Sequence, residues 1–160
     1  KELDALQIQH VRSTPPSEDE GKEPGLTLRC QRANKAAKSH EGKSIFVSIH
    51  INAAGSAGKW MTARGWSVFV GTSASSNSKK LASYMTAKAR EARVKVRVPD
   101  PQHEYWTANF TVLNKTSMPA VLVENFFQDN LEDVEFLLSD AGKKTVVNII
   151  LGGIKNYFGL

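Results

Sequence analysis

The chain has 160 residues, of which 41% are hydrophobic, 23% are charged and 8% are aromatic. This composition fits one compact domain and excludes a repeat array, a collagen-like fibre and a disordered acidic tail. Its apolar runs are far shorter than the roughly 20 residues that cross a bilayer, and its single cysteine excludes an internal disulfide and a cysteine-rich zinc module. The formal net charge of +5 predicts attraction to anions, but charge alone does not distinguish nucleic acid, acidic lipid and the polyanions of a bacterial envelope.

The first predicted element in chain order is a short strand over residues 6–11, where apolar and polar residues alternate. Prolines, glycines and carboxylates over 15–25 predict an exposed connection. Thr27 is expected to cap a helix over 28–42. The β-branched and aromatic run 45–49 then predicts a buried strand.

The rest of the chain is predicted to alternate strands with helices. Strands are expected over 65–71 and 119–123, and a basic amphipathic helix over 78–93. Two more helices follow, one over 131–138 after the cap Asn130 and one that Asp140 caps. Such alternation is typical of an α/β fold, so we expect a single, mostly parallel sheet with helices on both faces.

Two polar residues come directly after predicted buried strands. His50 follows the strand 45–49, and Glu124 follows the strand 119–123. Open α/β sheets bind ligands at the carboxyl ends of their strands. A histidine and a carboxylate in one cleft suit a proton relay, or a metal site in which the carboxylate acts on metal-bound water. Spacing alone also leaves a structural, hydrogen-bonded histidine open.

The segments around these two residues resemble a known family. Residues 48–53 (Ser-Ile-His-Ile-Asn-Ala), 65–69 (Gly-Trp-Ser-Val-Phe), 112–113 (Val-Leu) and 119–130 (Pro-Ala-Val-Leu-Val-Glu-Asn-Phe-Phe-Gln-Asp-Asn) resemble, in this order, the zinc-dependent N-acetylmuramoyl-L-alanine amidases often called Amidase_3. The similarity extends over most of the chain, from about residue 6 to 157. The histidine and glutamate motifs together make it specific.

The resemblance implies hydrolysis of the amide between N-acetylmuramic acid and the L-alanine of the peptidoglycan stem peptide. It implies that His50 binds Zn²⁺ and that Glu124 is the catalytic carboxylate. Asn52 is a candidate substrate-binding residue, with a local turn hydrogen bond as the alternative. Peptidoglycan is then the expected partner, and the expected location is periplasmic or extracellular, associated with the cell envelope.

The chain departs from the family in one respect. The family uses three protein ligands for zinc, and the other two, a histidine and a glutamate, precede the part of the pattern that this chain carries. We therefore expect an amidase-like catalytic domain over 1–160 that is truncated at its N-terminus. Two interpretations stay open, a retained part of a longer polypeptide and an inactive remnant. His10 and His103 are poor candidates for replacement ligands.

Two other functions remain as alternatives. A non-catalytic module that binds the cell wall would keep the amidase fold without its metal. A nucleic-acid-binding domain would rest on the basic charge alone, and because the sequence has no recognisable base-reading motif, we expect no nucleic-acid partner. We also expect no membrane span, and the sequence does not predict an oligomeric state.

Overall fold

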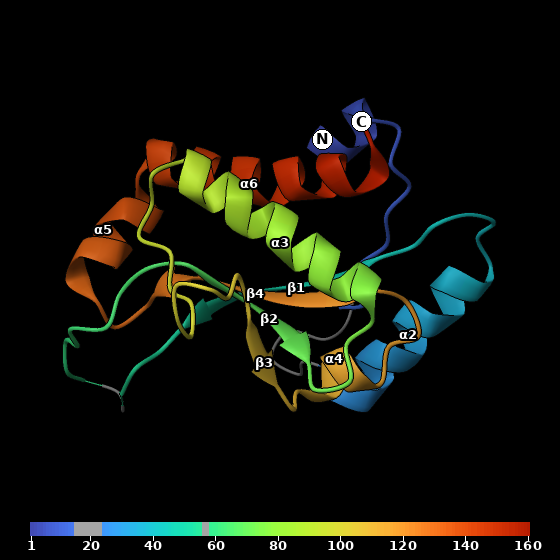
Figure 1. Cartoon of the computed structure of the whole chain (residues 1–160), viewed down its shortest axis with the longest axis horizontal. Coiled ribbons are helices and arrows are strands. Elements are labelled where there is room, and N and C mark those ends of the chain that lie inside the picture. Colours follow the sequence, from blue (N-terminus) through green and yellow to red (C-terminus); the bar gives the residue numbers. More distant parts are fainter. Residues whose placement is uncertain (15–23, 56–57) are drawn as a thin grey trace.

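Four strands form one sheet in the computed structural model, which describes residues 1–14, 24–55 and 58–160 (Figure 1). Their order across the sheet is β1-β4-β2-β3. The edge strand β1 (Phe46–Asn52) lies parallel to β4 (Ala120–Phe127). On its other side β4 lies antiparallel to β2 (Ser67–Gly71), which is parallel to β3 (Trp106–Ala108). The predicted single, mostly parallel sheet is confirmed, with one antiparallel contact at its centre.

Helices cover both faces of the sheet, as predicted (Figure 1). On one face lie α3 (Ser76–Glu91), which follows β2, and α6 (Asp140–Phe158), which follows β4 through α5 (Leu131–Leu138). On the other face lie α2 (Leu26–Lys38) and the short α4 (Thr111–Asn114). Each face therefore has its own apolar core.

The alternation of side chains along β4 assigns residues to these two cores. Val121 and Val123 are buried in the larger core, with α3 and α6. Ala120 and Leu122 are buried in the smaller core, with Cys30 of α2. Because successive side chains of a strand point to opposite faces, the residue at position 124 shares the face of α2 and α4.

The start of the chain differs from the prediction for residues 6–11. The helix α1 (Glu2–Ala5) comes first, and no strand follows it within residues 6–14. Leu3 and Ile8 pack against the larger core, and Gln7 between them has a φ of +56°. The apolar residues here pack against this core instead of pairing with a strand. Most of the predicted connection 15–25 lies outside the described residues.

Three other predictions need correction. The strand predicted at 45–49 is longer and lies at the edge of the sheet, where the side chains of Ile49 and Ile51 are 62% and 51% exposed. The helix α2 begins two residues before the expected position, because Gly25 is its extended N-cap and Thr27 is inside its first turn. Ser139, not Asp140, caps α6, since its side chain accepts a hydrogen bond from the Gly142 amide.

The described residues contain no helix with the length and apolar character that crossing a bilayer requires.

Candidate active site

His50 and Glu124 lie side by side on neighbouring strands. They are register partners in the parallel pair β1 and β4, and their side chains therefore project from the same face of the sheet. On the other side of Glu124, its register partner in β2 is Ser67. With strands about 4.8 Å apart, the three side chains form a polar row across the sheet. Both predicted site residues lie within their strands, in the carboxyl-terminal halves, because each strand continues beyond the predicted end.

Glu124 is a half-buried carboxyl group in an unusual environment. Burial raises its pKa to about 7, because removal from water disfavours the charged carboxylate. Its Oε2 atom is buried and has no hydrogen-bond partner among the described residues, and the same is true of the neighbouring Ser67 Oγ. Buried polar groups are nearly always hydrogen-bonded in folded proteins. A carboxyl group with this pKa can both accept and release a proton near neutral pH.

His50 is exposed and is oriented by its own strand. Its Nε2 atom lies 2.9 Å from the hydroxyl oxygen of Ser48, two residues earlier and on the same face of β1. His50 is exposed and the neighbouring Glu124 is half-buried. This part of the sheet face is therefore open to solvent.

Asn125 connects the two strands from the opposite face. Its amide Nδ2 donates to the carbonyl oxygen of His50 at 3.0 Å, and its Oδ1 accepts from the Trp66 Nε1–H at 3.1 Å. The side chain is only 2% exposed. Both ends of this amide are thus satisfied inside the protein, and the backbone of His50 is fixed to β4.

A bulge follows directly after the His50–Glu124 pair. The next register partners are Asn52 and Phe127, so β4 contains one residue more than β1 in this interval. Phe126 takes the left-handed conformation, with a φ of +68°. Its buried ring packs edge-on against Phe136 at 5.0 Å between centroids. Bulges of this kind redirect side chains beside functional sites.

The loop after β1 is anchored to the end of β4. Asp129 Oδ2 accepts from the amides of Ala54 and Gly55 at 2.8 and 2.9 Å. Further along, buried Asp133 accepts from the amides of Gly65 and Phe127 at 2.8 and 3.0 Å. These carboxylates hold both ends of the loop against the strand that carries Glu124.

Asn52 makes the local hydrogen bond that was the alternative to a substrate contact. Its side-chain Oδ1 accepts from the Ala53 amide at 2.8 Å. Its own carbonyl oxygen accepts from the Gln128 amide. Four further residues of this region were not predicted from the sequence, because pairing between distant elements brings them there: Ser67, Asn125, Asp129 and Asp133. The one available signal was the position of Asn125 directly after Glu124.

The donor groups that the described part of the chain brings near the site fall short of a complete zinc site. A catalytic zinc ion usually takes three protein ligands and a water molecule. Within residues 1–14, 24–55 and 58–160, no three His, Cys, Asp or Glu side chains lie close enough together to hold a metal ion. His10 and His103 make contacts near their own positions, to the Ile8 carbonyl oxygen and to Asp100. His50 therefore stands without two further candidate ligands close to it among the described residues.

The chain matches a known family over nearly its whole length. The family described as N-acetylmuramoyl-L-alanine amidase matches residues 2–156. An endolysin of Bacillus phage SPP1 is 35% identical over 116 residues, which are 72% of this chain and 39% of the endolysin. The N-acetylmuramoyl-L-alanine amidase CwlM of Bacillus licheniformis is 33% identical over 135 residues, which are 84% of this chain and 47% of CwlM. The chain thus spans less than half the length of these two relatives.

Solved structures share the fold. The amidase Ami1 from Mycobacterium smegmatis superposes with a TM-score of 0.80 at 22% identity, covering 98% of this chain and 70% of Ami1. The catalytic domain of CwlV from Bacillus (Paenibacillus) polymyxa var. colistinus gives a TM-score of 0.71 at 23% identity, covering 99% of this chain and 79% of that domain. At such identities the likeness establishes the α/β architecture.

Proposed function

The chain belongs to the N-acetylmuramoyl-L-alanine amidase family, and on that basis we propose that it hydrolyses the amide between N-acetylmuramic acid and L-alanine in peptidoglycan. The observation that carries this proposal is the register pair of His50 and Glu124 on an open part of the sheet face. The site acts at the bacterial cell wall, in the periplasm or outside the cell. Residues 1–160 are part of the catalytic domain of the whole protein.

Glu124 is the proton carrier of the proposed reaction. Its carboxylate accepts a proton from the water molecule that attacks the amide carbon. The carbon–oxygen bond forms, the carbon–nitrogen bond breaks, and the protonated carboxyl group gives the proton to the departing amine of L-alanine. A pKa of about 7 suits both steps, because the carboxyl group is then neither a very weak base nor a very weak acid at neutral pH.

We propose Zn²⁺ as the cofactor, with His50 as one of its ligands. When bound, such an ion polarises the carbonyl group and lowers the pKa of water to about 7. The described side chains do not complete this site, so the other ligands would come from a part of the domain that these residues do not include. The solved relatives, of which this chain covers 70% and 79%, are consistent with such a part.

Asn52 is proposed to contact the substrate through its Nδ2 group. The side-chain oxygen is engaged by the Ala53 amide, which leaves the amide hydrogens to donate. A carbonyl oxygen of the stem peptide or of the lactyl group is the fitting acceptor.

The test is the release of stem peptide from purified peptidoglycan by the full-length protein with added Zn²⁺. The wild type is expected to release peptides with a free L-alanine amine, and Glu124→Gln to reduce the rate by about 10²- to 10⁴-fold. Glu135→Gln is the matched control, since Glu135 is an exposed carboxylate on α5 and its loss should leave the rate unchanged. No release by the wild type, or undiminished release by Glu124→Gln, would contradict the proposal.

A second candidate is a wall-binding module without catalysis, which fits the lack of three close metal-ligating side chains among residues 1–14, 24–55 and 58–160. It predicts that the protein sediments with sacculi equally well with and without a chelator, and that His50→Ala changes nothing. Peptide release that depends on Zn²⁺ would exclude it.

A further inference from the structure

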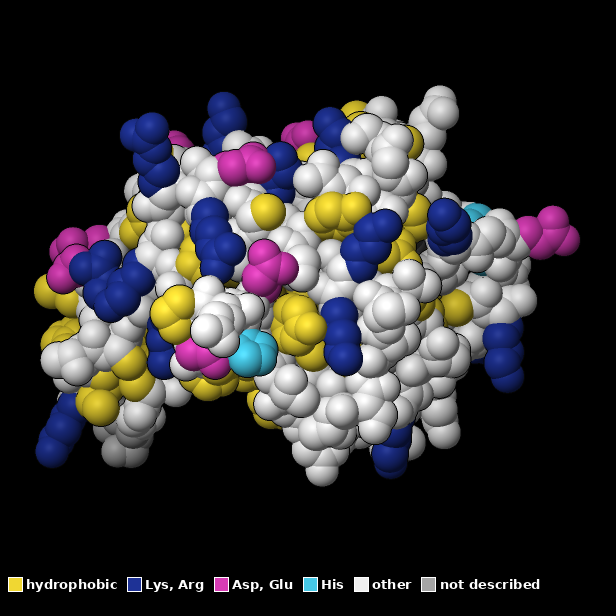
Figure 2. All heavy atoms as spheres, viewed as in Figure 1, with side chains coloured by type: hydrophobic (Ala, Val, Ile, Leu, Met, Phe, Trp, Pro, Cys, Tyr) yellow, Lys and Arg dark blue, Asp and Glu magenta, His cyan; other side chains and the backbone are white. Residues whose placement is uncertain are grey.

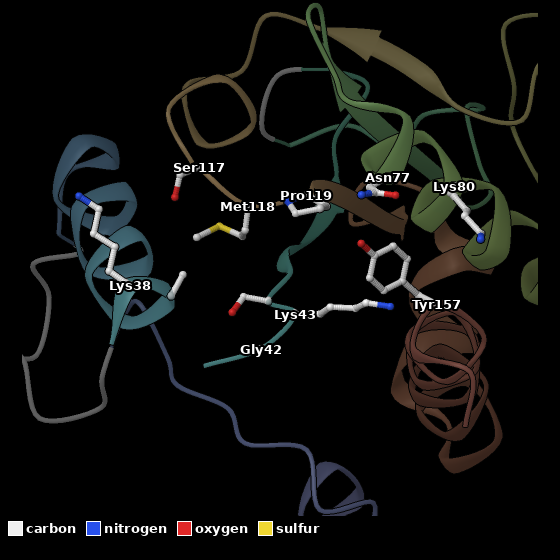
Figure 3. A pocket seen from close by; sticks show the side chains of 11 residues that line it. Lys38, Gly42, Lys43, Asn77, Lys80, Ser117, Met118, Pro119 and Tyr157 are labelled. Atoms are coloured by element: carbon white, nitrogen blue, oxygen red, sulfur yellow. The ribbon is translucent and has the colours of Figure 1, made fainter. Parts of the chain in front are cut away.

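A basic cavity lies at the opposite end of the parallel strands from His50 and Glu124. Its volume is about 420 Å³, and its walls come from the end of α2, the segment before β1, the start of α3 and the end of α6 (Figure 3). Ser44 lines the cavity and lies six residues before His50, a separation of about 20 Å along an extended strand. The cavity is therefore distinct from the candidate active site.

Three lysines line this cavity, and none of the described residues that line it is acidic. Lys38, Lys43 and Lys80 each contribute to its wall, and none of them forms an ion pair within the described part of the chain. The Lys80 ammonium lies 5.7 Å from the ring centroid of Tyr84, a contact that leaves its charge uncompensated. All three lysines are exposed, so they make the rim of the cavity basic.

Its charge differs from that of the general surface. Figure 2 shows Lys and Arg side chains spread over the visible face, with acidic and apolar side chains between them. Lys38 also lies in the last turn of α2, where a cation is favourable with or without a ligand. Lys43 and Lys80 lie outside the last turn of a helix, so the helix dipole does not account for their positions.

Neutral donors complete the lining. The Tyr157 hydroxyl points toward Asn77 in Figure 3, and both residues line the cavity together with Ser117. Asn77 is the second residue of the 16-residue helix α3, so its backbone amide belongs to the first turn, where amides lack acceptors within the helix. In Figure 3 the ammonium groups of Lys38 and Lys80 lie at the outer edge of this group of side chains. The hydroxyls and amides of the lining are donors that phosphate oxygens accept from.

We propose that this cavity binds a phosphate group, and that the phosphate belongs to an anionic phosphodiester polymer of the bacterial cell wall. The choice of polymer rests on the proposed function, because it places the protein at the wall. A membrane surface fits less well, since none of the exposed large hydrophobic side chains of the described residues lines the cavity, and insertion into a lipid interface uses such side chains beside the basic ones.

The binding test uses inorganic phosphate and the full chain, followed by NMR of backbone amides. Saturable shifts are expected at Gly42, Lys43, Asn77 and Ser117. The double variant Lys43→Gln/Lys80→Gln should weaken binding about five- to tenfold. Its control, Lys79→Gln/Lys144→Gln, removes the same charge from exposed lysines outside the cavity and should change affinity less than about twofold. Equal weakening by both variants, or shifts scattered over all lysines, would overturn the site.

The source of the phosphate is tested separately with Glu124→Gln, so that failure of the proposed hydrolysis does not affect the result. Sedimentation with intact walls is expected to exceed sedimentation with walls from which phosphodiester polymers have been extracted. The Lys43→Gln/Lys80→Gln change should abolish this difference. Equal binding to both wall preparations, or stronger binding to vesicles of anionic phospholipid, would overturn the choice of a wall polymer.

Discussion

The Asn125 side chain donates a hydrogen bond to the carbonyl oxygen of His50, so the residue next to the candidate carboxylate fixes the strand that carries the candidate metal ligand. The same side chain accepts from Trp66 in the larger core. The relative position of the two site residues thus depends on a buried amide behind them, at the point where the register of β1 and β4 shifts.

Asn125→Leu is expected to destabilise the fold by about 1–3 kcal/mol, because the Trp66 Nε1–H and the His50 carbonyl group both lose their partner. Urea unfolding measures this loss. Asn114→Ala is the control, since the Asn114 hydrogen bond to Asn109 is exposed, and it should change stability by less than about 0.5 kcal/mol. If the two variants unfold alike, the amide of Asn125 does not hold the strands together.

The raised pKa of Glu124 predicts that activity and stability change in opposite directions as the pH changes. The reaction needs the carboxylate, so the rate should fall as pH drops below about 7. The folded state binds the Glu124 proton more tightly than the unfolded state, in which the pKa of this group is near 4.5. The protonated carboxyl group therefore stabilises the fold fully below that pH, and this contribution to stability is lost as pH rises toward 7.

Glu124→Gln should remove this pH-dependent part of stability. Because the carboxyl group is half-exposed and screened by solvent, the expected gain over the wild type at pH 8 is about 1–2 kcal/mol, with little difference at pH 4. Urea unfolding at the two pH values measures it. A variant that is less stable than the wild type at pH 8 would show that Glu124 is not destabilised by burial.

Phe126 offers a test of backbone strain at the bulge. Both Phe126→Ala and Phe126→Gly lose the buried ring, at a cost of about 3–5 kcal/mol. Glycine adopts a φ of +68° without strain, so we expect the glycine variant to be about 1 kcal/mol more stable than the alanine variant. Calorimetric unfolding compares them. The usual order, with alanine more stable, would mean that the left-handed conformation does not persist.

Asp133 is expected to be the most sensitive carboxylate outside the site. Asp133→Ala leaves the buried amides of Gly65 and Phe127 without an acceptor, which should cost about 3 kcal/mol. Glu132→Ala is the adjacent control, because the Glu132 side chain is exposed and its partner among the described residues is Arg64; its loss should cost less than about 1 kcal/mol. Chemical denaturation of both variants checks the difference.

The sequence by itself determined the order of most strands and helices, the caps at Asn130 and at the start of the last helix to within one residue, and the positions of His50 and Glu124 toward the carboxyl ends of two strands. Local information is sufficient for these features. Hydrophobic periodicity identifies buried faces, turn residues mark the connections, and two motifs in order identify the family.

Only the tertiary structure decided which strand lies at the edge and which side chains surround the site. The run around Ile49 has the composition of a buried strand, but no described strand pairs with β1 on the side away from β4. Asn125 reaches Trp66 and His50 across 59 and 75 positions of the chain. Such contacts follow from the packing of the sheet, and no local period of the sequence encodes them.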